Sequence, residues 1–308
     1  MRGHCLSCGA GNPQWEYESS LDITREALLP SENRSPWIRP EALLHAITHD
    51  QLFVQYQPQI KFTTGQLAGV EALVRWRHPQ RGIVPPDHFI PLAEHTGLIL
   101  PLSRWVLNSA LQQYQQWHKG HPGSRMAVNL SMRNLQDQHC AETILTLCET
   151  WQVSPTWLTI EITESTLATD TEQVHATLTR LRQHGVWITL DDVGAGYASL
   201  AALQRLPLDE FKIDKPFIFA MRTDAKAAAI VHTLINLGHT LGLQVVAEGV
   251  EDRATYDLLA TQGCDLAQGY YVSRPLSAAD FLPWLHRTLW QSQPASVCFA
   301  RDTLVPCL

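Results

Sequence analysis

Short runs rich in β-branched and aromatic residues alternate with longer amphipathic segments, and this alternation constrains the fold more than any other feature. The strand candidates are Phe53–Ile60, Leu67–Trp76, Met126–Leu130, Leu158–Ile162, Val186–Leu190, Glu210–Ile213, Gln244–Ala247 and Leu266–Tyr270. The helix candidates between them include Leu102–Trp117, Glu142–Trp151, Glu172–His184, Ala225–Leu241 and Ala254–Gln262. Strands that alternate with helices pair in parallel. Eight strands in about 220 residues predict a closed barrel rather than an open sheet.

The connection between the first two strand candidates is too short for a parallel pair. Only the turn Lys-Phe-Thr-Thr-Gly-Gln separates Ile60 from Leu67, whereas parallel neighbours need a crossover of about a dozen residues or more. We therefore predict an α/β fold, a modified TIM (β/α)₈ barrel whose first two strands are antiparallel.

The regular pattern covers most of the chain but not its ends. Residues 1–38 are rich in Gly, Ser, Pro and Asn and are predicted to be a flexible tail. We assign residues 39–290 to the barrel, beginning with a short helix after Pro40, and residues 291–308 to a second tail. Cys5 and Cys8 form a Cys-x-x-Cys pair in the first tail, but a structural zinc site needs four ligands and no second pair lies nearby.

Charge and composition exclude several classes of protein. Acidic residues outnumber basic ones by 30 to 23, which argues against binding to a nucleic-acid duplex. A small anionic substrate remains compatible, because bound divalent cations can reverse the local field. No apolar run approaches the roughly 20 residues of a membrane span, and no secretory signal is present. Seven scattered cysteines without an export signal indicate reduced thiols and a cytoplasmic protein.

Polar side chains occupy the carboxyl ends of most predicted strands, which is where such barrels carry their chemistry. In chain order these residues are Glu71, Asn129, Glu161, Asp191, Asp192, Lys212, Glu248 and Gln268. One acid in a strand is more often the solvent-facing partner of an alternating pattern. The same feature on most strands indicates a function, because buried ionisable groups are costly unless they are paired or metal-bound.

Carboxylates and an amide supply only hard oxygen ligands, which suit Mg²⁺ or Mn²⁺ and not zinc. Asp191 and Asp192 could flank two cations about 4 Å apart, the spacing used in phosphodiester hydrolysis. Adjacent side chains of a strand normally point to opposite faces. We expect Gly194 and Gly196 to let the backbone turn so that both acids converge.

At this point the chain resembles the EAL-domain cyclic di-GMP phosphodiesterases, over about Pro40 to Trp290. The resemblance rests on ordered motifs: Gln57-Pro58, Glu71-Ala72-Leu73-Val74-Arg75-Trp76, Val128-Asn129-Leu130-Ser131, Glu161-Ile162-Thr163-Glu164, Asp191-Asp192-Val193-Gly194-Ala195-Gly196-Tyr197, Lys212-Ile213-Asp214-Lys215, Val246-Ala247-Glu248-Gly249-Val250-Glu251 and Gln268-Gly269-Tyr270-Tyr271, with Arg274-Pro275 after them. A single three-letter match would mean little, but eight motifs in order are specific.

The resemblance implies a role for each matching position. The positions that match metal ligands are Glu71, Asn129, Glu161, Asp191 and Asp192. The positions that match groups holding, activating or supporting the attacking water are Lys212, Glu248, Glu251 and Gln268. The positions that match substrate contacts are Gln57, Leu73, Arg75, Asp214 and Tyr271. For Tyr271, ordinary core packing is an equal alternative to a guanine contact.

Glu164 matches the glutamate that steadies the loop after the fifth strand, at Val193–Leu200, which in the family links the second metal site to a dimer partner. The resemblance thus implies a homodimer. Val193 replaces the family's usual aromatic residue, which we expect to weaken loop packing and to soften dimer coupling or metal affinity.

The implied activity is in-line hydrolysis of cyclic di-GMP to linear pGpG with two Mg²⁺ or Mn²⁺ ions per site, and calcium should inhibit. A second hypothesis is a catalytically weak or inactive module that acts as a cyclic di-GMP receptor or protein-binding regulator, and Val193 is the feature in its favour. A third, a metal-dependent barrel enzyme acting on another phosphate ester, does not explain the residues that match the guanine groove.

Overall fold

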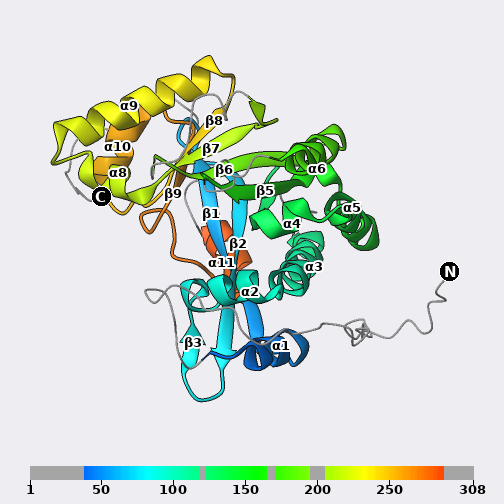
Figure 1. The fold of residues 1–308 in the computed structure, drawn as a ribbon. Helices are drawn as coiled ribbons and strands as arrows, with labels where there is room; N and C mark the ends of the chain where they lie inside the picture. Colours follow the sequence, from blue (N-terminus) through cyan, green and yellow to red (C-terminus); the bar gives the residue numbers. More distant parts are fainter. Residues whose placement is uncertain (1–37, 118–122, 165–170, 195–204, 288–308) are drawn as a thin grey trace.

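Eight strands close into a barrel in the computed structural model, which describes residues 38–117, 123–164, 171–194 and 205–287 (Figure 1). The strands are β1 (Leu52–Lys61), β2 (Leu67–His78), β3 (Gly82–Val84), β4 (Arg125–Asn129), β5 (Leu158–Thr163), β6 (Trp187–Val193), β7 (Glu210–Ile213), β8 (Gln244–Ala247) and β9 (Leu266–Gln268). The helices are α1 (Pro40–Thr48), α2 (Ile90–Thr96), α3 (Ile99–Trp117), α4 (Met132–Gln136), α5 (Cys140–Trp151), α6 (Glu172–Gln183), α8 (Lys215–Ala220), α9 (Ala225–Thr240), α10 (Arg253–Thr261) and α11 (Ala278–Arg287), with short 3₁₀ turns η1 (Pro86–His88) and η3 (Pro155–Trp157).

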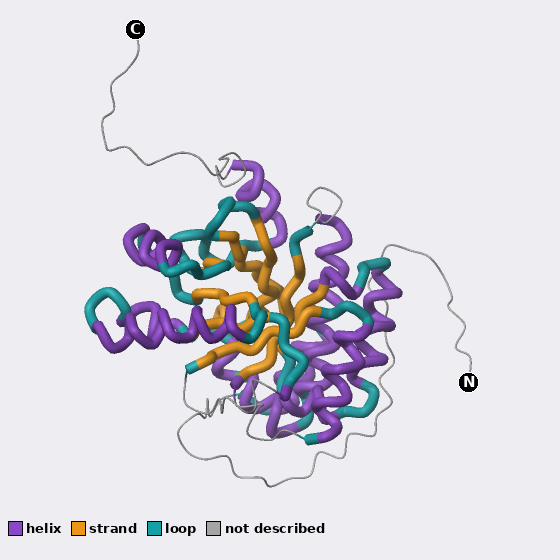
Figure 2. Tube along the Cα trace, turned by 90° about the horizontal axis from the view of Figure 1, so that it is seen from above, coloured by secondary structure: helices purple, strands orange, loops and turns teal. Residues whose placement is uncertain are grey.

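The order of the strands confirms the predicted modified barrel. Strands β2, β4, β5, β6, β7, β8 and β9 pair in parallel in that order, and β1 closes the ring by pairing antiparallel with both β2 and β9. Figure 2, seen from above, shows the strands at the centre and most helices around them. The antiparallel β1–β2 pair follows from the short turn that joins the two strands.

Helix starts follow local chemistry. Thr171, Asp224 and Asp252 each accept a hydrogen bond from a backbone N–H in the first turn of α6, α9 and α10, respectively. These acceptors satisfy donors that a helix cannot pair internally. Helix α1 instead begins with Pro40, which has no backbone N–H that needs an acceptor.

One strand was not predicted: the three-residue strand β3, which pairs with the last residues of β2. This pairing occurs because β2 is longer than its barrel neighbours. Strand β4 pairs only with Gly69–Ala72 of β2. The second half of β2 and the opposite residues of β1 therefore continue past the barrel as an antiparallel pair. This pair forms one wall above the carboxyl ends of the parallel strands.

Most buried apolar side chains form one large core, in which Trp76, Phe89 and Phe211 are fully buried, and Ala68, Val246 and Leu266 form a second, small cluster. Cys140, Cys148 and Cys264, the cysteines of the described ranges, are buried free thiols. Cys5 and Cys8 lie outside the described residues. Of the two predicted tails only Ile38 is described, and residues 288–290, which we assigned to the barrel, are not described. In the part of the chain that is described, helices long and apolar enough to cross a bilayer are absent.

Candidate active site

The polar residues predicted at the strand ends meet at one end of the barrel. Glu71 on β2 pairs across the sheet with Ala127 of β4, Asn129 at the end of β4 with Glu161 of β5, and Lys212 of β7 with Val246 of β8. Glu248 follows β8 directly, and Gln268 ends β9. The parallel register therefore brings residues that are up to about 200 positions apart to one rim of the barrel.

Lys212 is the centre of this cluster. Its ammonium nitrogen Nζ lies 2.8 Å from Glu248 Oε1, 3.2 Å from Glu161 Oε1, 3.3 Å from Glu71 Oε2 and 3.5 Å from Asp191 Oδ2. The lysine and Glu161 are completely buried, and the other three acids are nearly so. Four carboxylates thus share one cationic side chain in a site of low solvent access.

Two amides hold the carboxylates in place. The Asn129 amide donates to Glu71 Oε1 at 2.8 Å and to Glu161 Oε2 at 3.2 Å. The Gln268 amide donates to Glu71 Oε2 at 2.6 Å, and its own oxygen accepts from Gln59 at 2.8 Å. Glu71 is consequently fixed from both sides, which is the support that a metal ligand or catalytic group requires.

The pKa values of the cluster diverge because the acids compete for one cation. Burial alone would raise the pKa of Glu71, but Lys212 and the two amides bring it down to about 2. Burial and the neighbouring Glu71 raise the pKa of Glu161 well above its usual range. Burial also raises the pKa of Asp191 and brings that of Glu248 to about 7. Burial opposes the charge of Lys212, yet the four acids raise the pKa of its ammonium, which stays protonated.

Asp191 and Asp192 do converge. Gly194 has a positive φ of 110° and Gly196 lies outside the described residues, but the turn between the two acids comes before both glycines. The turn is made by Asp192 itself, which takes the left-handed φ of 60° inside β6, where the pairing with β7 is interrupted by a bulge. Its N–H donates to Asp191 Oδ1 at 2.9 Å, and a short polar side chain tolerates this backbone conformation better than most. The bulge re-aims a side chain that strand alternation would send to the opposite face.

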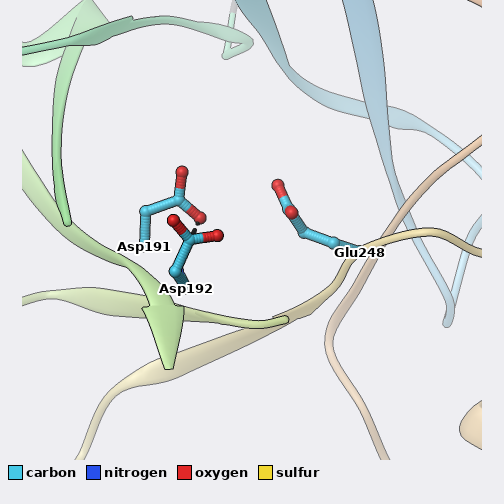
Figure 3. A group of neighbouring side chains, drawn as sticks. All are labelled: Asp191, Asp192 and Glu248. Carbon is cyan, nitrogen blue, oxygen red and sulfur yellow. Dashed lines mark hydrogen bonds between the residues drawn. The ribbon is translucent and has the colours of Figure 1, made fainter. Parts of the chain in front are cut away.

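A second group of acids results. One ligand oxygen from each of Asp191, Asp192 and Glu248 can be chosen so that all three lie within 4.8 Å of one another. Figure 3 shows these three carboxyl groups around a common space at the ends of β6 and β8. Asp191 and Glu248 belong both to this group and to the set around Lys212.

The donor set fits divalent cations. Four buried carboxylates face one ammonium, which leaves negative charge that a protein interior does not tolerate without a counter-ion. Within the described residues the buried Glu161 Oε1 accepts no hydrogen bond, and its charge partner is the Lys212 ammonium 3.2 Å away, which three other carboxylates share. Every available ligand atom here is oxygen, the preference of Mg²⁺ and Mn²⁺. Glu71 and Glu161 are held together by the Lys212 ammonium and the Asn129 amide. Glu161 lies on β5, the strand next to β6, which carries Asp191 and Asp192.

A cavity of about 440 Å³ opens above this cluster. Of the predicted substrate contacts, Gln57, Leu73 and Arg75 line it, and Glu251 lines it as well. Arg75 is held by two hydrogen bonds, from Nε to Gln55 Oε1 and from Nη1 to the carbonyl of Val74, both 2.9 Å long. The guanidinium is therefore oriented before any anion arrives.

Two predicted substrate contacts are not among the residues that line the cavity. The Tyr271 ring packs on Tyr256 with ring centres 5.3 Å apart, which matches the packing alternative, and Tyr270 lines the cavity in its place. Asp214 is the half-buried N-cap residue of α8, and after burial its charge is the largest cause that raises the pKa of Asp192.

Sequence reasoning gave no role to several residues that line the cavity: Pro85, Pro86, Asp87, Lys215, Phe219, Gly249, Tyr270 and Pro275. A signal existed for part of this wall. The Gly82 turn before Ile83-Val84 is typical of a short hairpin strand, which would have placed the Pro85-Pro86-Asp87 segment beside the site.

Glu164 contacts the last described residue before the loop that follows β6. It is buried at the end of β5, and its Oε2 accepts the N–H of Gly194 at 3.0 Å. Val193 is buried in the core. Residues 195–204 lie outside the described residues, so the predicted effect of Val193 on this loop stays a prediction.

Comparison with known proteins agrees with this geometry. Cyclic di-GMP phosphodiesterase PA2567 of Pseudomonas aeruginosa is 39% identical over 240 residues, which are 78% of this chain and 41% of that protein. The bifunctional diguanylate cyclase/cyclic di-GMP phosphodiesterase MucR of the same species is 41% identical over 241 residues, 78% of this chain and 35% of that protein. The chain thus spans less than half the length of these relatives.

Solved structures share this fold. A structure of the PaMucR phosphodiesterase in complex with c-di-GMP is 40% identical, has a TM-score of 0.75 and covers 78% of this chain and 98% of that chain. The EAL enzyme Bd1971, in its cAMP- and cyclic-di-GMP-bound form, is 28% identical with a TM-score of 0.76, over 80% of this chain and 67% of that one. The EAL domain family matches residues 40–275, more than half of the sequence, and the chain with this carboxylate-lined barrel belongs to that family.

Proposed function

We propose that this protein hydrolyses cyclic di-GMP to linear pGpG. The observation that carries the proposal is the convergence of Glu71, Glu161, Asp191 and Glu248 on Lys212 at the floor of an open cavity. Relatives named as cyclic di-GMP phosphodiesterases, and a related phosphodiesterase solved with c-di-GMP, support the choice of substrate.

Two cation positions follow from the donor sets. Glu71, Asn129, Glu161 and Asp191 would hold one ion, with the Asn129 amide turned so that its oxygen faces the metal, and Asp191, Asp192 and Glu248 would hold the other. Divalent cations supply a lowered pKa for water and stabilisation of charge on phosphoryl oxygens. We propose Mg²⁺ or Mn²⁺ in these positions and inhibition by Ca²⁺, whose longer and looser coordination suits the site poorly.

The residues of the chain do the remaining work. Lys212 keeps its charge among the acids and offsets negative charge that grows on the phosphate. Glu248, whose Oε1 lies 2.8 Å from the Lys212 ammonium at the floor of the cavity, takes the proton of the attacking water in this proposal. Arg75 binds a substrate phosphate with a guanidinium that Gln55 has already oriented.

The other predicted residues have supporting roles in this proposal. Gln268 fixes Glu71, and Glu251 forms part of the cavity wall. Gln57 and Leu73 border the nucleotide, and Glu164 anchors the start of the loop after β6. For the guanine contact the geometry favours Tyr270 over Tyr271, and Asp214 acts through the position of α8.

We also make proposals on the domain bounds, the oligomeric state and the location of the protein. We propose residues 39–290 as the catalytic barrel between two tails, a homodimer coupled through the loop after β6, and a cytoplasmic location. The receptor alternative keeps Val193 as its argument, whereas the presence of Glu71, Asn129, Glu161, Asp191 and Asp192 in the sequence supports the phosphodiesterase proposal.

An assay of purified protein with cyclic di-GMP and Mg²⁺, with pGpG resolved by chromatography, tests the proposal. Wild type and the variant Lys226→Ala, which alters an exposed lysine of α9, should form pGpG. Glu71→Ala and Lys212→Ala should not. Binding of cyclic di-GMP without pGpG would favour the receptor alternative, and equal rates in all four proteins would refute the assignment of the site.

A further inference from the structure

Phe219 is an aromatic side chain that the packing of the fold does not explain. It lies on α8, in the segment that follows β7, and 51% of its surface is exposed. Large apolar side chains are usually covered, and an exposed one inside a cavity points to a ligand. Phe219 and Tyr270 are the two strongly exposed aromatic side chains that line the cavity above the acid cluster.

The position of the ring is set by the loop after β8. Gly249 has a φ of +70°, and a Cβ added there would lie 3.0 Å from Phe219 Cε1 and 2.8 Å from Lys215 Cγ. One edge of the ring therefore packs against bare backbone, which only a glycine allows, while half of its surface stays open. Among the described residues no aromatic ring or cation packs on Phe219, whereas the Tyr270 ring already carries the Arg274 guanidinium at 4.2 Å.

The Phe219 ring lies next to the acid cluster at which we propose that the substrate phosphate binds. Gly249, against which Phe219 packs, directly follows Glu248 of the three-acid group. A substrate phosphate at that group would hold its own nucleoside beside α8. Nucleic-acid bases stack on aromatic rings in many proteins, because each base has a planar π-face.

We propose that Phe219 is the stacking platform for one purine base of the cyclic dinucleotide, and that this contact raises affinity without taking part in bond cleavage. The inference rests on the proposed function and adds a specificity-determining residue to it. Lys215, which lines the same cavity beside the ring, adds a positive charge next to the anionic substrate. The base on the other side of the substrate would lie nearer Tyr270 and Arg75.

Steady-state kinetics with cyclic di-GMP and Mg²⁺ separate binding from chemistry. Phe219→Ala should raise KM about tenfold, the loss expected for one stacked base, with kcat within about threefold of wild type. Phe219→Trp should restore KM. Ile230→Ala, which removes an exposed apolar side chain of α9 away from the cavity, is the matched control and should change neither constant.

A spectroscopic readout isolates stacking from stability. A cyclic dinucleotide carrying 2-aminopurine, added with Ca²⁺ to prevent turnover, should lose fluorescence on binding to wild type and to Phe219→Trp but not to Phe219→Ala. An unchanged KM and equal quenching in Phe219→Ala would overturn the inference while the phosphodiesterase activity stands. Absence of any turnover by wild type would overturn the proposed function and this inference together.

Discussion

Replacing Lys212 with methionine removes the buried cation from the acid cluster while keeping a side chain of similar length. The lysine is fully buried and lies 2.8–3.5 Å from oxygens of four carboxylates. One such pair at about 3 Å is worth about 5 kcal/mol at an effective dielectric of 20, before desolvation and repulsion among the acids are subtracted. Loss of one partner of a buried ion pair typically destabilises by about 3–5 kcal/mol.

In a chain of this size 1 kcal/mol shifts the melting temperature by about 2–4 °C, so Lys212→Met without metal should melt about 10 °C below wild type at pH 8. The deficit should shrink at pH 6, where the acids take up protons, and in 10 mM Mg²⁺, where cations replace the ammonium.

Thermal melts followed by circular dichroism, with chelator or with Mg²⁺, measure both effects. Lys215→Met is the control, because Lys215 is 59% exposed and 4.0 Å from Glu248, a geometry worth less than about 1 kcal/mol. A Lys212→Met deficit below about 2 °C at pH 8, or one that neither pH nor Mg²⁺ changes, would refute the electrostatic reasoning.

Three further predictions concern protons, backbone and substrate. Glu248 has a pKa of about 7 in the fold against an ordinary 4.5, so the folded state binds more protons between these values, and metal-free wild type should lose stability from pH 6 to pH 8. Mg²⁺ should remove this trend in the same melts, and a stability that rises with pH would contradict it. Asp192→Val should destabilise by about 1–3 kcal/mol through its φ of 60°, whereas Asp192→Asn should keep the fold and weaken Mn²⁺ binding; denaturant titrations that rank them otherwise would count against the bulge. Gln55→Leu should raise KM about tenfold by releasing Arg75, and Gln55→Glu should not; identical KM values would show that Arg75 needs no such support.

Much of the site could be read from the sequence because the barrel converts strand ends into neighbours. Glu161 stands in a run of β-branched residues, so its burial could be predicted, and Lys212 lies between Phe211 and Ile213 near the end of a predicted strand. Parallel register then determined that they meet. The antiparallel start was equally accessible, because the turn after Ile60 is shorter than any parallel crossover.

The remaining features depend on tertiary contacts. The left-handed Asp192 arises where β6 and β7 lose register, and local sequence alone favoured the following glycines as the turning point. Tyr270 and Tyr271 are adjacent and chemically identical, so only the end of β9 at Gln268 decides which of them faces the cavity. Phe219 belongs to a short helix whose place beside Gly249 is not encoded in any motif.

Electron paramagnetic resonance of Mn²⁺ bound to the metal-free protein at pH 8 tests the central claim, which is that side chains from separate strands hold a pair of divalent ions. The account predicts two Mn²⁺ per chain with a spin-coupled spectrum, and loss of the coupling in Asp191→Asn, because Asp191 belongs to both donor sets. One isolated Mn²⁺ per chain, or a spectrum that Asp191→Asn leaves unchanged, would contradict it.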